Sequence, residues 1–111
     1  AVEAIRTQYP RAKIDVKLVD VYNNIVDSLG DDRWPIDLIY QAADLIGVKP
    51  NTIAMRGGTD GSALSVKGLV TPNYFTGAHN FHSYAEFLPL PSLHKSLQMT
   101  LTILDLVAKG K

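Results

Sequence analysis

The sequence predicts an α/β fold, and three observations support that prediction. Residues 13–21 alternate apolar and polar side chains, which is the period-two pattern of a half-buried strand. Residues 93–108 instead repeat apolar side chains every three or four positions, as an amphipathic helix does. Strand-like and helix-like segments alternate along the chain, and this order is typical of parallel sheets that are covered by helices.

The first part of the chain predicts one helix, one strand and a connection. Apolar residues three and four apart give residues 1–9 a helical face, and Pro10 ends that helix. The strand over residues 13–21 follows, and residues 22–32 are rich in turn-forming residues, which indicates a connection or hinge. Because one helix and one strand cannot close a sheet, we expect a domain boundary near this connection.

The next segment predicts a helix and then a buried strand. Asp32 suits the cap of the helix, Pro35 suits its first turn, and Gly47 ends it. A short apolar run over residues 52–55 predicts the strand. The helix is expected to face the core with Ile36, Ile39, Ala43 and Ile46.

The remainder predicts a short helix over residues 60–67, an irregular or edge strand over residues 70–75, and a long loop before the longest helix. Ser92 is the expected cap of that last helix, and Gly110 stands near its end. The stripe expected to face the core consists of Leu93, Leu97, Leu101, Leu104 and Ala108.

The composition is that of a globular domain without an electrostatic partner. The 111 residues are 46% hydrophobic and 20% charged, and eleven basic residues balance eleven acidic ones. This balance excludes the basic patch of a nucleic-acid or anionic-membrane binder. The absence of cysteine excludes disulfides and thiolate metal sites and favours a cytoplasmic protein. Because the sequence starts without Met and inside a predicted helix, we expect it to be cut from a longer protein.

A glycine-rich segment follows the strand predicted at residues 52–55. Residues 56–61 read Arg-Gly-Gly-Thr-Asp-Gly, and glycines there allow a close backbone approach and expose N–H groups to an anion. The spacing matches neither the dinucleotide-binding fingerprint nor a P-loop. On spacing alone the segment is either a plain strand-to-helix turn or a ligand loop.

Histidines and a glutamate follow in the long loop. His79 and His82 would share a face only on a helix, and the Thr-Gly at residues 76–77 argues against a helix there, so a site made by both is not expected. A lone loop histidine is more often a hydrogen-bonding or solvated residue than a metal ligand. Glu86 is compatible with a surface charge, and His94 flanks the stripe of the last helix.

Several segments, in this order and spacing, resemble the peptidase T family, the aminotripeptidases among the di-zinc M20 metallopeptidases. They are residues 20–24, 56–61, 68–69, 72–73, 75–77 and 82–87. The resemblance implies that residues 31–111 are the C-terminal part of an M20-type α/β catalytic domain. It also implies that residues 1–21 end the smaller lid domain and that residues 22–30 form the hinge between them.

The resemblance also assigns metal-site roles. His82, which opens a His-x-x-x-Glu segment with Glu86, is implied to be a zinc ligand. Glu86 then either orients the loop of His82 or is a surface charge. Thr59 and Asp60 either tie the glycine segment to the metal-bearing segment as outer-shell groups or cap the following helix.

Substrate-binding roles are implied for Arg56 and Asn24. The guanidinium of Arg56 either holds a substrate carboxylate or forms a structural ion pair. Two positions depart from the family pattern near the implied ligand: Ala78 stands where the family tends to have Gly, and His79 where it tends to have Tyr.

The implied activity of the parent protein is removal of the N-terminal residue from tripeptides, with two zinc ions activating a bridging water. The family takes its other ligands and its base from a His-x-Asp segment, a bridging Asp and a Glu-Glu pair. The sequence contains neither His-x-Asp nor Glu-Glu. Since a catalytic zinc needs about three protein ligands, we expect the isolated chain to be inactive and to require the missing N-terminal catalytic and lid segments.

Exposed strand edges would make the isolated chain a homo-oligomer. The alternative function is a free-standing α/β interaction or anion-binding module that uses the glycine-rich segment, and the sequence alone leaves it open.

Overall fold

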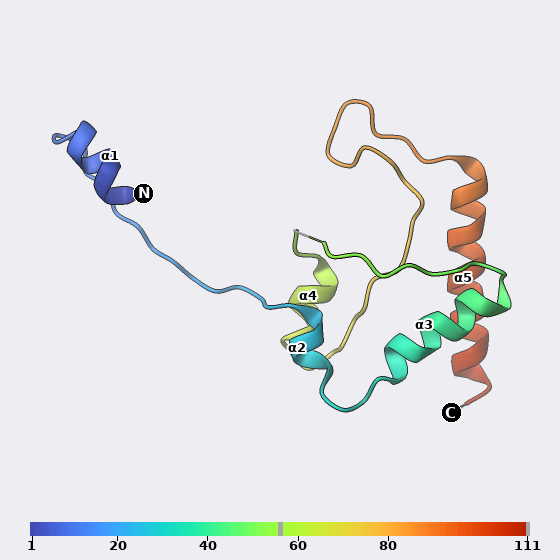
Figure 1. Ribbon diagram of the computed structural model, residues 1–111. Helices are drawn as coiled ribbons and strands as arrows, with labels where there is room; N and C mark the ends of the chain where they lie inside the picture. The colour runs from blue at the N-terminus through green and yellow to red at the C-terminus, as the bar shows by residue number, and fades with distance from the viewer. Residues whose placement is uncertain (56, 111) are drawn as a thin grey trace.

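Two pairs of helices and one separate helix make up the structure (Figure 1), a computed structural model that describes residues 1–55 and 57–110. The helices are α1 Val2–Gln8, α2 Ile25–Leu29, α3 Trp34–Leu45, α4 Asp60–Ser65 and α5 Leu90–Ala108. α3 packs against α5, and α2 packs against α4. Figure 1 shows α1 far from the other helices, at the end of a long extended connection.

The main core lies between α3 and α5. Ala42 and Ala43 of α3, Ile46 at its end and Met99 of α5 are buried together, and Met99 is 0% exposed. The Nζ atom of Lys95 donates a hydrogen bond of 2.9 Å to the carbonyl oxygen of Ile46. A cation is favourable at a helix C-terminus, so this contact ties the end of α3 to α5.

In the smaller pair, α2 and α4, the segment at Thr71 passes close to the backbone of α4. Ser65 Oγ donates to the carbonyl oxygen of Gly61 at 2.6 Å and accepts the N–H of Thr71 at 3.0 Å. A Cβ atom on Gly61 would lie 2.4 Å from the carbonyl oxygen of Thr71. Glycine is therefore required at this position because the following segment passes directly over the helix.

The three predicted strands do not form. Within the described residues, segments 13–21, 52–55 and 70–75 contain no strand, and the bridge between His79 and Phe87 stands outside any ladder. A strand needs a neighbour that exchanges backbone hydrogen bonds with it, and the alternation of side chains cannot supply one. The α/β prediction is thus confirmed in its helices, and its sheet is not.

A short helix, α2, occupies the connection predicted at residues 22–32. The side chain of Asn24 caps it, since Asn24 Oδ1 accepts the N–H of Val26 at 3.1 Å. Gly30 follows with a positive φ of 59°. The predicted connection is therefore irregular at both ends of this helix, as its turn-forming residues indicated, but helical in between.

The predicted core stripe of α3 is correct only in part. Ala43 and Ile46 are buried and Ile39 packs beside them, but Leu38 and Ala42, which the prediction left out, are buried as well.

The predicted core stripe of α5 faces away from α3. Leu93, Leu97, Leu101 and Leu104 are exposed, whereas Met99 is fully buried. Both faces of α5 are apolar, and the spacing could not show which one α3 covers. Ser92 is not the cap either, because α5 begins at Leu90. Ser92 instead packs against Gly77, where an added Cβ would lie 2.4 Å from the Ser92 Cβ.

The molecule is extended for its length. Its radius of gyration is 19.7 Å, where a compact domain of this length has about 13 Å. Its accessible surface is 9299 Å², where a compact protein of this mass exposes about 6,000 Å². Among the described residues, no helix combines the length and apolarity of a membrane span.

Candidate functional site

The implied metal ligand lies in a closed loop, residues 79–87, which we call the His82 loop. His79 and Phe87 pair at its base: the N–H of His79 donates to the carbonyl oxygen of Phe87 at 2.9 Å, and the reverse bond measures 3.3 Å. Their rings stack with centroids 5.0 Å apart and an interplanar angle of 15°. The base of the loop is therefore held by backbone and side chains together.

Local hydrogen bonds also hold the interior of the His82 loop. Ser83 Oγ donates to the carbonyl oxygen of Asn80 at 2.7 Å, and Asn80 Nδ2 donates to the carbonyl oxygen of Ala85 at 3.2 Å. The N–H of Glu86 reaches the carbonyl oxygen of Ser83 at 3.2 Å. These bonds connect residues 80, 83, 85 and 86 across a loop that contains no helix.

His82 itself has a strained backbone. Its φ angle is 62°, and that of Asn80 is 54°, a region that residues other than glycine seldom adopt. Glu86 Oε2 accepts the N–H of His82 at 3.0 Å. The carboxylate of Glu86 thus binds the backbone of the histidine rather than its ring, and the side chain of His82 is exposed.

Thr59 caps α4. Thr59 Oγ1 accepts the N–H of Ser62 at 3.3 Å, and Ser62 Oγ accepts the N–H of Thr59 at 3.4 Å, which is a capping box. Asn73 Nδ2 also donates to Thr59 Oγ1, at 3.1 Å. Asp60 is the first residue of the helix, where a carboxylate is favourable. Of the two roles considered for Thr59, the structure shows the capping of α4.

Gly58 of the glycine-rich segment lies against Tyr22, in the segment that leads into α2. A Cβ atom on Gly58 would lie 1.9 Å from Cζ of Tyr22, so the tyrosine ring occupies that space. Neither Gly57 nor Gly58 has a positive φ, and close approach is what requires glycine at residue 58. Asn24 follows two residues after Tyr22, whereas Arg56 lies outside the described residues.

The predicted site residues therefore form two groups. Tyr22, two residues before Asn24, packs on Gly58, and Figure 1 shows the turn of the His82 loop well separated from α2 and α4. Nowhere in residues 1–55 and 57–110 do three His, Asp or Glu side chains gather as metal ligands would. Because a zinc site requires about three protein ligands, the described residues do not form one by themselves.

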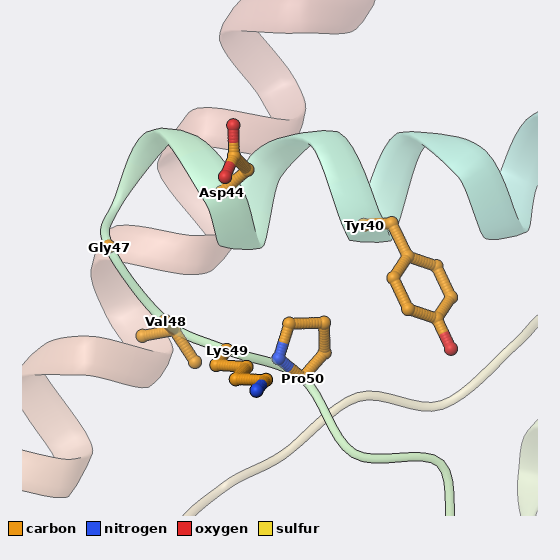
Figure 2. A pocket seen from close by; sticks show the side chains of 6 residues that line it. All are labelled: Tyr40, Asp44, Gly47, Val48, Lys49 and Pro50. Atoms are coloured by element: carbon orange, nitrogen blue, oxygen red, sulfur yellow. The ribbon is translucent and has the colours of Figure 1, made fainter.

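Two hollows lie away from these residues. One of about 360 Å³ lies beneath the C-terminal half of α3, with the rings of Tyr40 and Pro50 on either side of it (Figure 2). Its lining residues are Tyr40, Asp44, Gly47, Val48, Lys49 and Pro50. The other, of about 480 Å³, lies where the start of α3 meets the end of α5. Neither contains a predicted site residue.

Sequence reasoning missed three contacts that shape the candidate site. They are the stack of His79 on Phe87, the bond from Asn73 to Thr59 and the packing of Tyr22 on Gly58. One of them had a signal: His79 stands where the family tends to have Tyr, and either ring can stack on Phe87. The other two join residues that are far apart in the chain, and no local pattern reports them.

Comparison with known proteins finds relatives with similar names but no matching family model. No model of a protein family matches the chain. A peptidase T-like protein of Yersinia pestis is 56% identical over 109 residues, which are 98% of this chain and 27% of that protein. A peptidase T-like protein of Rhizobium meliloti is 44% identical over 106 residues, 96% of this chain and 26% of that protein. Peptidase T of Clostridium botulinum is 38% identical over 104 residues, 94% of this chain and 26% of that protein.

The chain thus spans about a quarter of the length of the curated relatives it matches, and almost all of its own length takes part in the match. The resemblance to the peptidase T family that the sequence motifs predicted is confirmed over nearly the whole chain.

Proposed function

We propose that this chain is the C-terminal part of a zinc-dependent aminotripeptidase, which removes the N-terminal residue from tripeptides. The observation that supports this most is the match of 98% of the chain, at 56% identity, to a protein named peptidase T-like. The isolated chain is inactive in this proposal, because it holds too few ligands for a metal centre. The proposal includes a cytoplasmic location, which cell fractionation would test.

His82 is the ligand that this chain contributes. Its side chain is exposed on a loop whose base and interior are hydrogen-bonded, and Glu86 holds its backbone N–H. A ligand held in place by such hydrogen bonds loses less freedom when it binds a metal ion than one on an unsupported loop. The remaining ligands and the general base come from the rest of the parent protein. When bound, the metal centre supplies an activated water and a Lewis acid.

Asn24 and Arg56 contact the substrate in this proposal. Asn24 Oδ1 is engaged with the N–H of Val26, which leaves the amide Nδ2 as a donor toward a substrate carbonyl or carboxylate. Arg56 offers a bidentate donor to a carboxylate. Residues 1–21 belong to the lid and residues 22–30 to the hinge, and the long extended connection between α1 and α2 is compatible with that division (Figure 1).

The test measures zinc content and tripeptide hydrolysis for the full-length parent, its His82→Ala variant and the isolated chain. We expect about two zinc ions and activity in the parent, and a loss of both in the variant and in the isolated chain. His94→Ala is the matched control, because His94 is an exposed histidine of α5 outside the His82 loop. We expect it to retain metal and activity.

Two results would overturn the proposal. Unchanged zinc content and activity in His82→Ala would show that the ligand assignment is wrong at its central residue. The natural protein could instead consist of these residues alone, fold without any further segment and bind phosphate or carboxylate at residues 56–61. That result would favour the free-standing anion-binding module.

A further inference from the structure

α5 carries apolar side chains on two opposite faces. Met99 faces α3 and is fully buried, and Ile103 and Leu106 pack beside it. At about 100° per residue, Leu97 points about 160° away from Met99. The second face, which we call the leucine face, consists of Leu90, Leu93, Leu97, Leu101 and Leu104, which are between 45 and 69% exposed.

A surface helix has one apolar stripe and a polar opposite face, and a helix that is apolar on all sides is buried. The leucine face extends over 15 positions of α5, which is about 21 Å of helix. All five of its residues are leucines, so the face carries no charge and no polar side chain. α3 covers the opposite side of the helix, so nothing in the α3–α5 pair accounts for this face.

The exposed surface has the size expected for an incomplete domain. The chain exposes 9299 Å², about 3,000 Å² more than a compact protein of its mass. Permanent interfaces bury about 2,000–5,000 Å² in total. The extended segment that joins α1 to α2 accounts for part of this excess, and apolar residues such as Ile53 and Met55 are exposed as well.

We propose that the leucine face of α5 docks on an uncharged, apolar surface formed by the part of the longer protein outside these 111 residues. This rests on the proposed function only in that a longer parent exists. The 109 matched residues make up 27% of the Yersinia pestis relative, so about three-quarters of that protein lies outside the match. The match takes in 98% of this chain, hence nearly all of α5, and that remainder is long enough to form the missing layer.

Thiol labelling tests the proposal without any use of activity. The chain contains no cysteine, so Leu101→Cys introduces one thiol in α5 whose reaction with a maleimide is measured on its own peptide by mass spectrometry. Gln98→Cys, three positions earlier on an exposed polar side of α5, is the matched control. In the full-length protein we expect Leu101→Cys to react about 100-fold more slowly than Gln98→Cys. In the dilute isolated chain the two should react within a few-fold of each other.

Equal labelling rates in the folded full-length protein would overturn the proposal, and so would protection that disappears on dilution, which would mark a second copy as the occupant. If Leu101→Cys does not fold, Leu97→Cys gives the same reading one turn earlier. The outcomes remain separable from those of the proposed function. A protected Leu101→Cys in a protein that does not cleave tripeptides would keep the interface and reject the peptidase.

Discussion

Glu86 accepts the backbone N–H of His82 across 3.0 Å and thereby holds a histidine whose φ angle is 62°. A non-glycine residue in this region costs about 1–2 kcal/mol, so the conformation persists only where its surroundings maintain it. The hydrogen bond from the His82 N–H is one of the interactions that do so. If His82 binds zinc, the zinc affinity should therefore depend on the carboxylate of Glu86.

Removing the carboxylate of Glu86 should weaken metal binding by the full-length protein. We expect Glu86→Ala to lower zinc affinity about 10- to 100-fold, since the N–H of His82 loses its partner and the loop relaxes. Glu86→Gln retains an acceptor oxygen and should fall between this variant and the unmodified protein. Zinc titration against a competing chelator gives both values. Unchanged affinity in Glu86→Ala would mean that the carboxylate is only a surface charge.

Gly61→Ala should destabilise the pair of α2 and α4. Alanine is about 1 kcal/mol better than glycine inside a helix, but its Cβ would lie 2.4 Å from the backbone oxygen of Thr71. Such overpacking costs about 1–3 kcal/mol and should match or exceed the gain in helix propensity. We expect a lower melting temperature of the full-length protein. Gly57→Ala, which meets no atom within 4 Å, should leave it unchanged. A rise for Gly61→Ala would show that Thr71 moves aside.

Truncation of Met99 should destabilise the isolated chain far more than truncation of Leu101, although the two residues are only two positions apart. Met99→Ala removes a side chain that is fully buried against α3 and should cost about 2–5 kcal/mol. Leu101→Ala removes an exposed one and should change stability by about 0.5 kcal/mol or less. Far-UV circular dichroism during denaturation measures both. The reverse order would restore the leucine stripe as the face that packs on α3.

An aromatic ring at residue 79 should be needed to hold the base of the His82 loop. The stack of His79 on Phe87 is worth about 1 kcal/mol. Its loss in His79→Ala should therefore speed exchange of the Phe87 N–H about fivefold. His79→Tyr keeps a ring and should keep the protection. Hydrogen exchange followed by NMR compares the three proteins. Equal protection in His79→Ala would show that the backbone bonds suffice.

Sequence patterns alone were enough to predict four of the helices, α1, α3, α4 and α5, and the resemblance to peptidase T proteins. Local chemistry was enough for α3 and α5: a proline in the first turn of α3, the glycine after its end, and an apolar repeat through α5. Asp32, the predicted cap of α3, is not its N-cap, which is Arg33, although Asp32 Oδ1 accepts the N–H of Trp34. The family motifs were equally local, and the match to peptidase T proteins along the chain confirms them. Helix formation depends mainly on neighbours within four residues, and a sequence contains those neighbours.

Which surfaces meet depends on the packing of the elements in space. Met99 rather than Leu101 lies against α3, and Tyr22 lies over Gly58. Within residues 1–55 and 57–110, the segments predicted as strands have no strand to pair with. A strand needs a neighbouring strand for its backbone hydrogen bonds, and a helix with two apolar faces needs another element to cover each face. The residues of the strand or helix do not specify which segment takes that place. Periodicity shows that a face is apolar, and only the arrangement of the other elements shows what covers it.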